Sequence, residues 1–549
     1  MPENSKAYSI LTLSEKLESL ELRIRNIESI LRREGLAPYA MGEDLQDTGA
    51  LKPRESDNQA IEANVMEYGL AWLSSIVFLL GIIFFMAWIR NRGYAEISSI
   101  VGYTAAFSVF LLSFFLRRAF PHMMSLLTIC GLLLLYYNTI RLYFFTPEPI
   151  IPYRPVVLIM TMSVIAVQVY YAIRKNSEFF AVVSVMLLLL TALINDSAWL
   201  TLTIIGIGSV LTLTLYSRFG WWRLMIVGIF FVYFSHLLWL LNNPLMGHPL
   251  QAVSGPNSGI LHLFGYATAF SLSIVLPVRK PGPAHVSGSI SFINLFIFTL
   301  LVLLEIGIFY TGNYTWIFGL ISIMSLSYSV VLKRKTESIF MPSLYACFGF
   351  MSLSGAIYGY ATFPDAFLLL TLQSLLVVSL ALWYRSKIIV MVNTLLYLSI
   401  LTAYLVSTPP VNEVNFMFAF VALATARILN WKKERLVLKT DFMRNVYLVS
   451  GFIMVLFSLN HALPGHLVTL SWTIAAVFYF IMSVLLGNIK YRYMGIATIL
   501  LTGIHLLLVD MAKMDIGNRV IAFLFFAAIT LGISLYYTKR IKKKTGEIK

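Results

Sequence analysis

The chain consists of about eighteen apolar segments of roughly 20 residues each, which follow one another with short polar turns between them. A segment of this length matches an α-helix that crosses a bilayer, whereas a barrel strand is about half as long. Alternation of apolar and polar residues, typical of membrane strands, is absent from these segments. Because backbone groups in hydrocarbon need hydrogen-bond partners within the protein, the segments predict an all-α, polytopic membrane bundle of about 18 transmembrane helices.

The composition agrees with this fold class. Hydrophobic residues make up 58% of the 549 positions, charged residues make up 12%, and the mean hydropathy is +0.79. A soluble domain carries about 25% charged residues.

The expected spans are 69–88, 96–116, 122–143, 155–173, 178–194, 198–216, 221–241, 258–277, 288–310, 314–332, 340–360, 364–384, 388–406, 413–430, 442–460, 465–486, 491–512 and 518–538.

The turns between the spans alternate between basic and nearly uncharged. Turns after even-numbered spans, together with the C-terminal tail, carry most of the 41 Lys and Arg residues, such as Arg174 and Lys175 or the Lys333–Lys335 run. Because Lys and Arg in short loops stay in the cytoplasm, both termini are predicted to be cytoplasmic. The +15 charge then requires no nucleic-acid partner, and the basic turns are suited to anionic lipid headgroups on the cytoplasmic face.

The N-terminal segment has a different periodicity. Apolar residues step by three and four at Ile10, Leu13, Leu17, Leu20, Ile24, Ile27 and Leu31. This spacing predicts a cytoplasmic coiled-coil helix over residues 1–34 that forms a parallel homodimer through residues 10–31. The alternative is a single amphipathic helix that lies on lipid or on the protein's own cytoplasmic face.

Three further regions complete the expected domain organisation. Residues 35–68 contain Gly, Pro and mixed charges without an apolar face, which predicts a flexible linker. Residues 69–538 form the multi-span domain, and 539–549 form a basic cytoplasmic tail. Cys130 and Cys347 both fall inside spans and are expected to be small core residues.

Two ends of the membrane region resemble a known family. The shared features are Trp72-Leu73, Gly81, Phe84-Phe85 and Arg117-Arg118 at the start, and Asp510, Arg519, Phe523 and Tyr536-Tyr537 before the basic tail. With the N-terminal coiled coil and linker, this order resembles the bacterial multi-pass membrane proteins grouped as domain of unknown function 2339. His505 stands where members of that family often have Lys. The resemblance implies a bacterial inner-membrane protein without an assigned activity.

Motifs of soluble enzymes are absent from the sequence. It contains no phosphate-binding Walker loop, no dinucleotide-binding glycine pattern after a strand, no His-Glu-x-x-His and no paired Cys motif. The histidines lie on separate spans without helical i, i+4 pairing, so no metal site is expected. No cofactor is expected either.

Polar residues at membrane depth are the candidate site. The topology places Glu305, Asp510, His236, His262, His461, His505, Arg141 and Arg519 near the outer ends of their helices. Such residues are costly inside a bilayer, and histidine titrates near neutral pH, so an outer-face polar cluster of this kind suits proton-coupled work. The alternative is structural, because polar groups near headgroups and single interhelical donors are tolerated without function. Four amides, Gln168, Asn294, Gln373 and Asn393, are expected to make interhelical hydrogen bonds.

Three functions fit these features. Transport or translocation of an envelope-related substrate, either lipid-linked or amphipathic, is favoured over an enzyme, since many spans accompany an outer polar cluster and no soluble catalytic domain. The second is a membrane enzyme that modifies a lipid-linked or surface glycan, with Glu96 as the acidic residue near the first outer turn. The third is a scaffold that recruits a partner through the coiled coil.

Overall fold

A computed structural model describes residues 70–116, 118, 121–145, 148–255, 258–279, 284–431, 441–510 and 516–544. The chain divides into two units, residues 1–77 and 78–549, and nearly all described residues belong to the second. The predicted coiled coil with its homodimer, the linker and the last five residues of the tail lie outside the described residues, so those interpretations stay predictions.

The described part of the chain is all-helical, with 18 α-helices and no strand, as the apolar segments predict. Seventeen of these helices are long and apolar enough to cross a membrane, so the protein is a multi-pass integral membrane protein. The helices are α3 (Leu70–Asn91), α4 (Ala95–Leu116), α5 (Pro121–Ile140), α6 (Arg154–Lys175), α7 (Glu178–Asn195), α8 (Ala198–Phe219), α9 (Trp222–Leu240), α10 (Gly259–Leu272), α11 (Ala284–Phe309), α12 (Tyr314–Lys335), α13 (Phe340–Tyr360), α14 (Asp365–Tyr384), α15 (Lys387–Ser407), α16 (Asn412–Trp431), α17 (Asp441–Ala462), α18 (Gly465–Leu486), α19 (Ile489–His505) and α21 (Ile516–Lys544).

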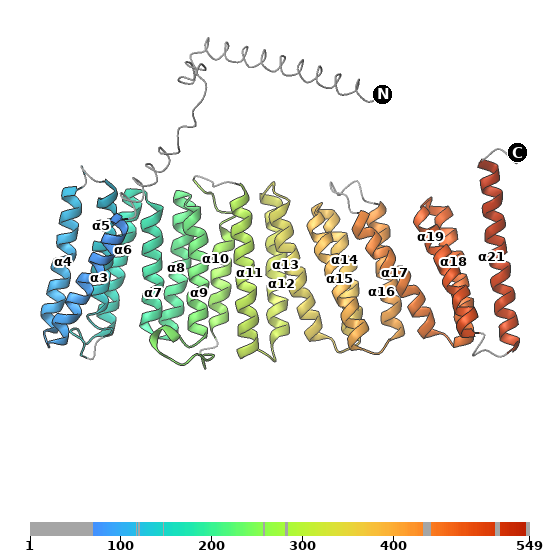
Figure 1. The fold of residues 1–549 in the computed structure, drawn as a ribbon, viewed down its shortest axis with the longest axis horizontal. Coiled ribbons are helices and arrows are strands. Elements are labelled where there is room, and N and C mark those ends of the chain that lie inside the picture. The colour runs from blue at the N-terminus through green and yellow to red at the C-terminus, as the bar shows by residue number, and fades with distance from the viewer. Residues whose placement is uncertain are drawn as a thin grey trace, which may run out of the picture. The chain divides into compact units, whose positions relative to one another are not determined.

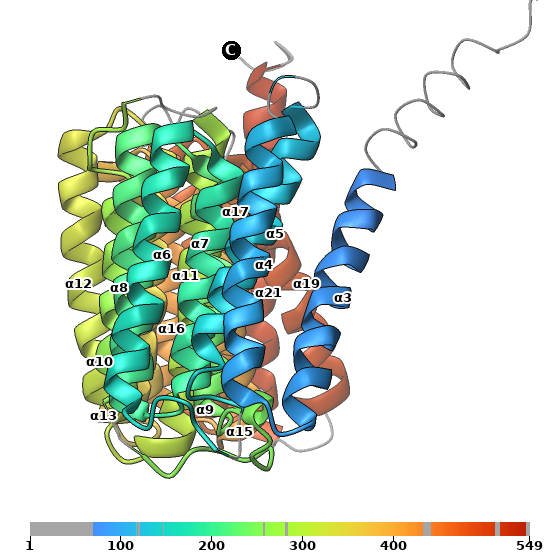
Figure 2. The same ribbon diagram turned by 90° about the vertical axis from the view of Figure 1, so that its left-hand side faces the viewer.

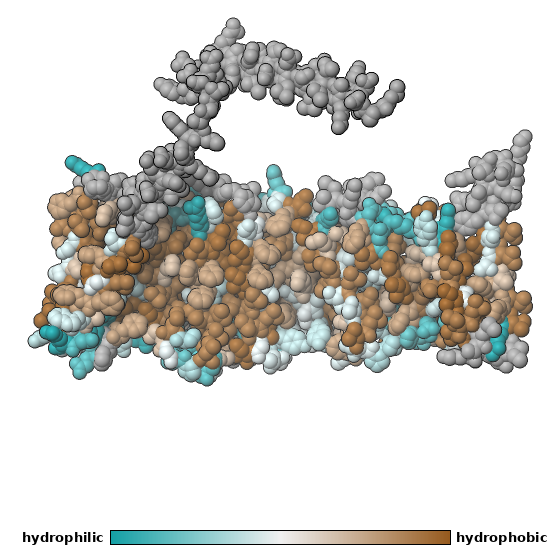
Figure 3. All heavy atoms as spheres, in the orientation of Figure 1, coloured by the Kyte–Doolittle hydropathy of each residue, from teal (hydrophilic) through white to brown (hydrophobic). Residues whose placement is uncertain are grey.

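Within the second unit the helices stand side by side in chain order, from α4 to α21 (Figure 1). The view along this row shows them in more than one layer (Figure 2). Apolar side chains form a continuous belt between two hydrophilic edges (Figure 3). We call the edge with turns 176–177, 220–221 and 336–339 the basic end, and the edge with turns 196–197, 241–258 and 361–364 the opposite end.

Short turns depend on residues that adopt a left-handed backbone. Asn176, Asp196 and Gly220 all have φ near +50° to +75° directly after α6, α7 and α8. Gly and, to a lesser degree, Asn and Asp tolerate this conformation, so the chain reverses direction within two residues. This explains why α6 to α9 form tight hairpins that place basic and neutral turns at alternate ends.

One helix is shorter than its apolar segment predicts. The expected span was 258–277, whereas α10 ends at Leu272 and has 14 residues. At about 1.5 Å per residue it extends roughly 21 Å, less than the roughly 30 Å of a hydrocarbon core. Pro277 explains the early end, because its ring would clash with the carbonyl of Ser273 in a continuing helix.

The predicted interhelical amide bonds are present. Gln168 donates from Nε2 to the Leu132 carbonyl at 3.1 Å, and Gln373 donates to the Phe350 carbonyl at 2.8 Å. Asn294 donates to the Ala267 carbonyl at 3.2 Å, and Asn393 donates to the Ser374 carbonyl at 3.1 Å. Each amide joins neighbouring helices where lipid cannot satisfy the polar group. Cys130 and Cys347 are both buried and unbridged, as expected.

The alternation of turns predicts the result of a labelling experiment. Single cysteines in turns 336–339 and 361–364 are expected on opposite sides of the membrane, because only α13 separates them. Reaction with a membrane-impermeant thiol reagent, in right-side-out and inverted vesicles, checks this. A cysteine in turn 385–386 is the control, and it is expected to be labelled from the same side of the membrane as a cysteine in turn 336–339. Labelling of turns 336–339 and 361–364 from the same side would contradict the helix count.

Candidate functional site

A buried histidine–glutamate pair lies between α9 and α11. His236 Nε2 and Glu305 Oε1 are 2.8 Å apart, and both side chains are 0% exposed. Among the residues whose side chains the structure describes, Glu305 is the one carboxylate that is fully buried. An ionisable pair at membrane depth is costly to bury, so such a pair is a functional candidate by default.

A second contact fixes the two helices that carry the pair. Tyr233 lies one turn before His236 on α9, and Asn294 lies three turns before Glu305 on the same face of α11. The Tyr233 hydroxyl donates to Asn294 Oδ1 at 2.6 Å, inside the core. The same two helix faces therefore meet at both levels, which holds the imidazole against the carboxyl group.

The proton count of the pair determines what it can do. A neutral imidazole with a protonated carboxyl and an imidazolium with a carboxylate contain the same number of protons and have no net charge. Loss of one proton leaves a net negative charge, and gain of one leaves a net positive charge. Full burial opposes both charged states. Full burial therefore favours the two forms without net charge, which differ only in whether the proton between the groups is on the imidazole or on the carboxyl group.

Gly259 and Trp239 form the wall of the pair on the side of α10. A Cβ atom on Gly259, the first residue of α10, would collide with Glu305 Oε1 and would lie 2.6 Å from Cζ3 of Trp239. The Trp239 ring centroid lies 5.2 Å from that of His236. Only glycine allows α10 to begin this close to the carboxyl group.

A cavity of about 220 Å³ lies beside α8, α9 and the loop that follows α9. It is lined by Asp196, Ala198, Thr201, Trp239, Asn242, Asn243, His248 and Val253. His248 Nε2 and Asp196 Oδ2 are 2.7 Å apart, and both side chains are partly exposed. Asn243 donates to Asp196 Oδ1 at 3.1 Å and to the Leu193 carbonyl at 2.8 Å. These contacts hold the 241–258 loop on the α7–α8 turn. Trp239 belongs both to this cavity and to the wall of the buried pair.

The other predicted site residues lie elsewhere. His262 is the nearest, one turn into α10, and its Nδ1 is 2.9 Å from the Ser258 carbonyl. Arg141 follows α5, is buried, and packs on the Tyr137 ring at 5.2 Å. The eight residues therefore divide into separate groups along the row of helices.

The third group lies on α17 to α21. His461 Nδ1 is 3.1 Å from the Phe457 carbonyl, and His505 Nδ1 is 3.3 Å from Thr469 Oγ1. Arg519 is in α21, and the Asp510 side chain lies outside the described part. Figure 1 shows these helices far along the row from α9 and α11.

Sequence reasoning did not assign Asp196, His248, Asn243, Trp239 and Gly259 to the site. The Asp196–His248 contact joins residues 52 positions apart, and the His236–Glu305 contact joins residues 69 apart. The one available signal was topological, because all these residues belong to turns or helix ends on the same side. Which of them meet depends on packing among α7 to α11.

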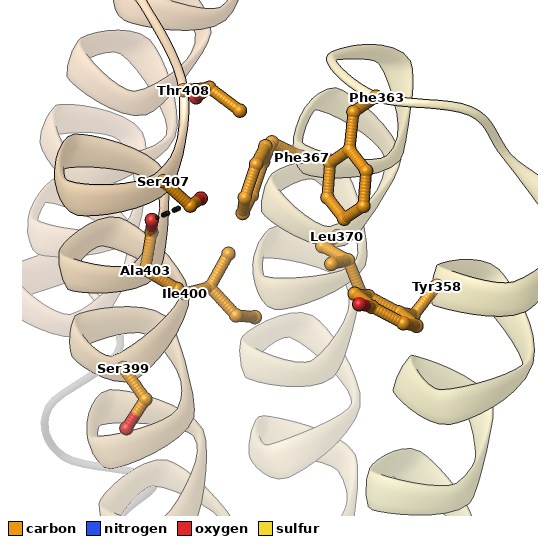
Figure 4. Close-up of a pocket in the computed structure, with 9 residues that line it drawn as sticks. All are labelled: Tyr358, Phe363, Phe367, Leu370, Ser399, Ile400, Ala403, Ser407 and Thr408. Atoms are coloured by element: carbon orange, nitrogen blue, oxygen red, sulfur yellow. Dashed lines mark hydrogen bonds between the residues drawn. The ribbon is translucent and has the colours of Figure 1, made fainter.

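A larger cavity than that beside Trp239 has no charged residue in its lining. It has a volume of about 660 Å³ and lies among α13, α14 and α15. Figure 4 shows the rings of Phe363 and Phe367 facing Ile400 and Ser407 of α15. The Ser407 hydroxyl donates to the Ala403 carbonyl of the same helix at 2.6 Å. Such a lining suits apolar contact and offers no group for proton transfer, so we place the candidate site at the His236–Glu305 pair.

No family model, curated protein or solved structure matches the chain. The chemistry of the pair and its cavity therefore carries the functional assignment. Among the described residues no group of three or more His, Cys, Asp or Glu side chains could hold a metal ion.

A glycine substitution tests the wall of the pair. Gly259→Ala is expected to displace the Glu305 carboxyl group and to destabilise the protein by about 1–3 kcal/mol, since the added methyl group has no space. Thermal unfolding in detergent measures the change. Gly265→Ala on the same helix is the control, because its added Cβ meets nothing within 4 Å. Equal stability of the two variants would show that the contact at Gly259 is loose.

Proposed function

We propose that the protein is a transporter that translocates an envelope-related, lipid-linked substrate and couples this movement to proton transfer at the His236–Glu305 pair. The observation that carries the proposal is the complete burial of both groups at 2.8 Å from each other. Glutamate and histidine are the residues that proton-driven membrane proteins use inside their spans.

The pair has the properties that coupling requires. It holds one exchangeable proton in a neutral state, and burial prevents release until the surroundings change. A conformational change that admits water at one end of the bundle lowers the cost of the charged state, and closure restores that cost. Proton binding and release are thereby linked to the conformation of α9, α10 and α11.

The substrate class and the location belong to the same proposal. A mainly apolar cavity among α13, α14 and α15, such as that of Figure 4, suits a substrate with a lipid chain. We place the protein in the bacterial inner membrane with both termini in the cytoplasm, since the basic end carries the Lys and Arg turns. Anionic lipids then contact that end, and the family of unknown function named above is its proposed family.

Reconstitution tests the proposal. The purified protein is placed in liposomes that contain a fluorescently labelled lipid-linked glycan, and a membrane-impermeant reductant quenches the label in the outer leaflet. An imposed pH gradient is expected to accelerate transfer of the glycolipid between leaflets at least tenfold. Liposomes without a gradient and liposomes without protein are the controls. Transfer at the same rate with and without the gradient would overturn proton coupling.

A further inference from the structure

The cavity at the opposite end and the buried pair have one residue in common. Trp239 lines the cavity, and the Cζ3–Cη2 edge of its indole faces the position where Gly259 meets Glu305 Oε1. The indole nitrogen lies on the other side of that ring. Trp239 is 5% exposed, so the ring itself is enclosed. The indole therefore stands as a partition between a partly exposed polar cavity and the enclosed pair.

Several buried polar atoms around this partition have no hydrogen-bond partner among the described residues: Trp239 Nε1, Asn243 Oδ1, His236 Nδ1, Glu305 Oε2 and Ser258 Oγ. Buried polar atoms in native proteins are almost always paired, and ordered water supplies the partner where the protein does not. Two of these atoms belong to residues that line the cavity, and two belong to the pair itself. Their occurrence both on the cavity residues and on the pair indicates that ordered water can occupy both sides of the indole.

The cavity is large enough for this role. One water molecule occupies about 30 Å³ of liquid, so about 220 Å³ has room for several. Asp196, Thr201, Asn242 and His248 supply further donors and acceptors along its wall. Asp196 and His248 are 38% and 43% exposed, which connects the cavity with the aqueous phase.

We propose that this cavity is the water-filled entrance through which protons reach the His236–Glu305 pair, with Trp239 as its gate. The inference rests on the proposed function and adds where protons enter, which is the end of the bundle that carries turns 196–197 and 361–364. A hydronium ion in the cavity gives its proton to the deprotonated pair and remains as water, so only O–H or N–H bonds form and break. Movement of the Trp239 indole connects water in the cavity with water beside the His236–Glu305 pair.

The titratable groups that surround the pair are few. Tyr266 of α10 lies with its ring centroid 5.7 Å from that of His236, and its hydroxyl donates to the Leu202 carbonyl at 3.0 Å. His262 lies on α10, and Tyr310 follows α11. Asp196 and His248 are the groups in contact with the cavity. The route therefore runs past Trp239 rather than through another described acid.

Cysteine labelling tests whether water fills the cavity. In a Cys130→Ala/Cys347→Ala background, Thr201→Cys places a thiol on the cavity wall, while Leu200→Cys places one on the neighbouring position outside the cavity lining, which is 46% exposed. A small water-soluble thiol reagent added from the opposite end is expected to modify the Thr201→Cys variant at least tenfold faster. Equal rates, or a faster reaction at Leu200→Cys, would overturn the water-filled entrance. This test needs no substrate and no change at the pair.

Proton exchange tests the gate. Infrared difference spectra identify the carboxyl band of Glu305 by its loss in Glu305→Gln, and transfer to deuterated water then measures its exchange. Trp239→Ala is expected to accelerate exchange at least tenfold, whereas Trp239→Phe, which keeps a ring, is expected to stay near the wild-type rate. Trp316→Ala, on a 79% exposed tryptophan of α12, is the control.

The outcomes separate the two proposals. Exchange that is unchanged in Trp239→Ala overturns the gate and leaves the proton role of the pair intact. Absence of any exchangeable proton at the pair, with neither a Glu305 carboxyl band nor a His236 imidazolium band that shifts in deuterated water, overturns the proton role itself, whatever the cysteine labelling shows.

Discussion

Glu305→Gln is expected to abolish gradient-driven transfer, with a loss of about 100-fold or more, since a positioned acid–base group contributes at least that factor to proton-transfer steps. The amide keeps the size of the carboxyl group and its contact with His236, so the bundle is expected to fold normally. The liposome assay with the labelled glycolipid measures the loss.

The control is an exposed carboxylate at the same end of the bundle. Glu413 lies in the first turn of α16 at the same end of the bundle and is exposed. Glu413→Gln is expected to transfer glycolipid at the wild-type rate. Retention of gradient-driven transfer in Glu305→Gln would mean that the pair is structural, and transport would then require a different site.

Glu305→Ala with His236 retained is expected to destabilise the protein by about 3–5 kcal/mol, because removal of one member of a buried pair leaves the other without its partner. Unfolding in detergent with increasing denaturant measures the change. The double variant His236→Leu/Glu305→Leu is expected to recover most of this loss, since apolar side chains of similar volume replace a buried ionic pair at little cost.

The double variant also separates stability from function. It is expected to be stable and inactive in gradient-driven transfer, because it contains no exchangeable proton at the site. A double variant that is as unstable as Glu305→Ala would show that the pair supplies most of the packing energy between α9 and α11. A stable double variant with full transfer would exclude the pair from coupling.

The fold was largely predictable because hydropathy and charge act locally. A segment such as 340–360 is long and apolar enough to be a helix whatever its neighbours, and α13 has those bounds. Asn195-Asp196 marks a tight turn because Asp196 tolerates the left-handed conformation it has in the structure. One exception is α10, where Pro277 ends the helix inside an apolar segment that hydropathy alone extends.

The site was only partly predictable. The sequence identified Glu305 and His236 as costly residues at the same depth, but it grouped them with His461, His505 and Arg519, which lie on helices far along the row. Depth follows from position within a span, which is local. Lateral position among the helices depends on how ridges, small residues and hydrogen bonds pack, which is not local.

The sequence by itself determined the class of protein, the helices and the alternation of basic and neutral turns, because the bilayer imposes length, hydropathy and charge rules on each segment separately. Only the tertiary structure decided that His236 meets Glu305, that Gly259 lets α10 begin against the carboxyl group, and that Trp239 lies between this pair and a cavity. Those contacts arise between helices, where the close approach of particular side chains depends on the packing of α7 to α11 together.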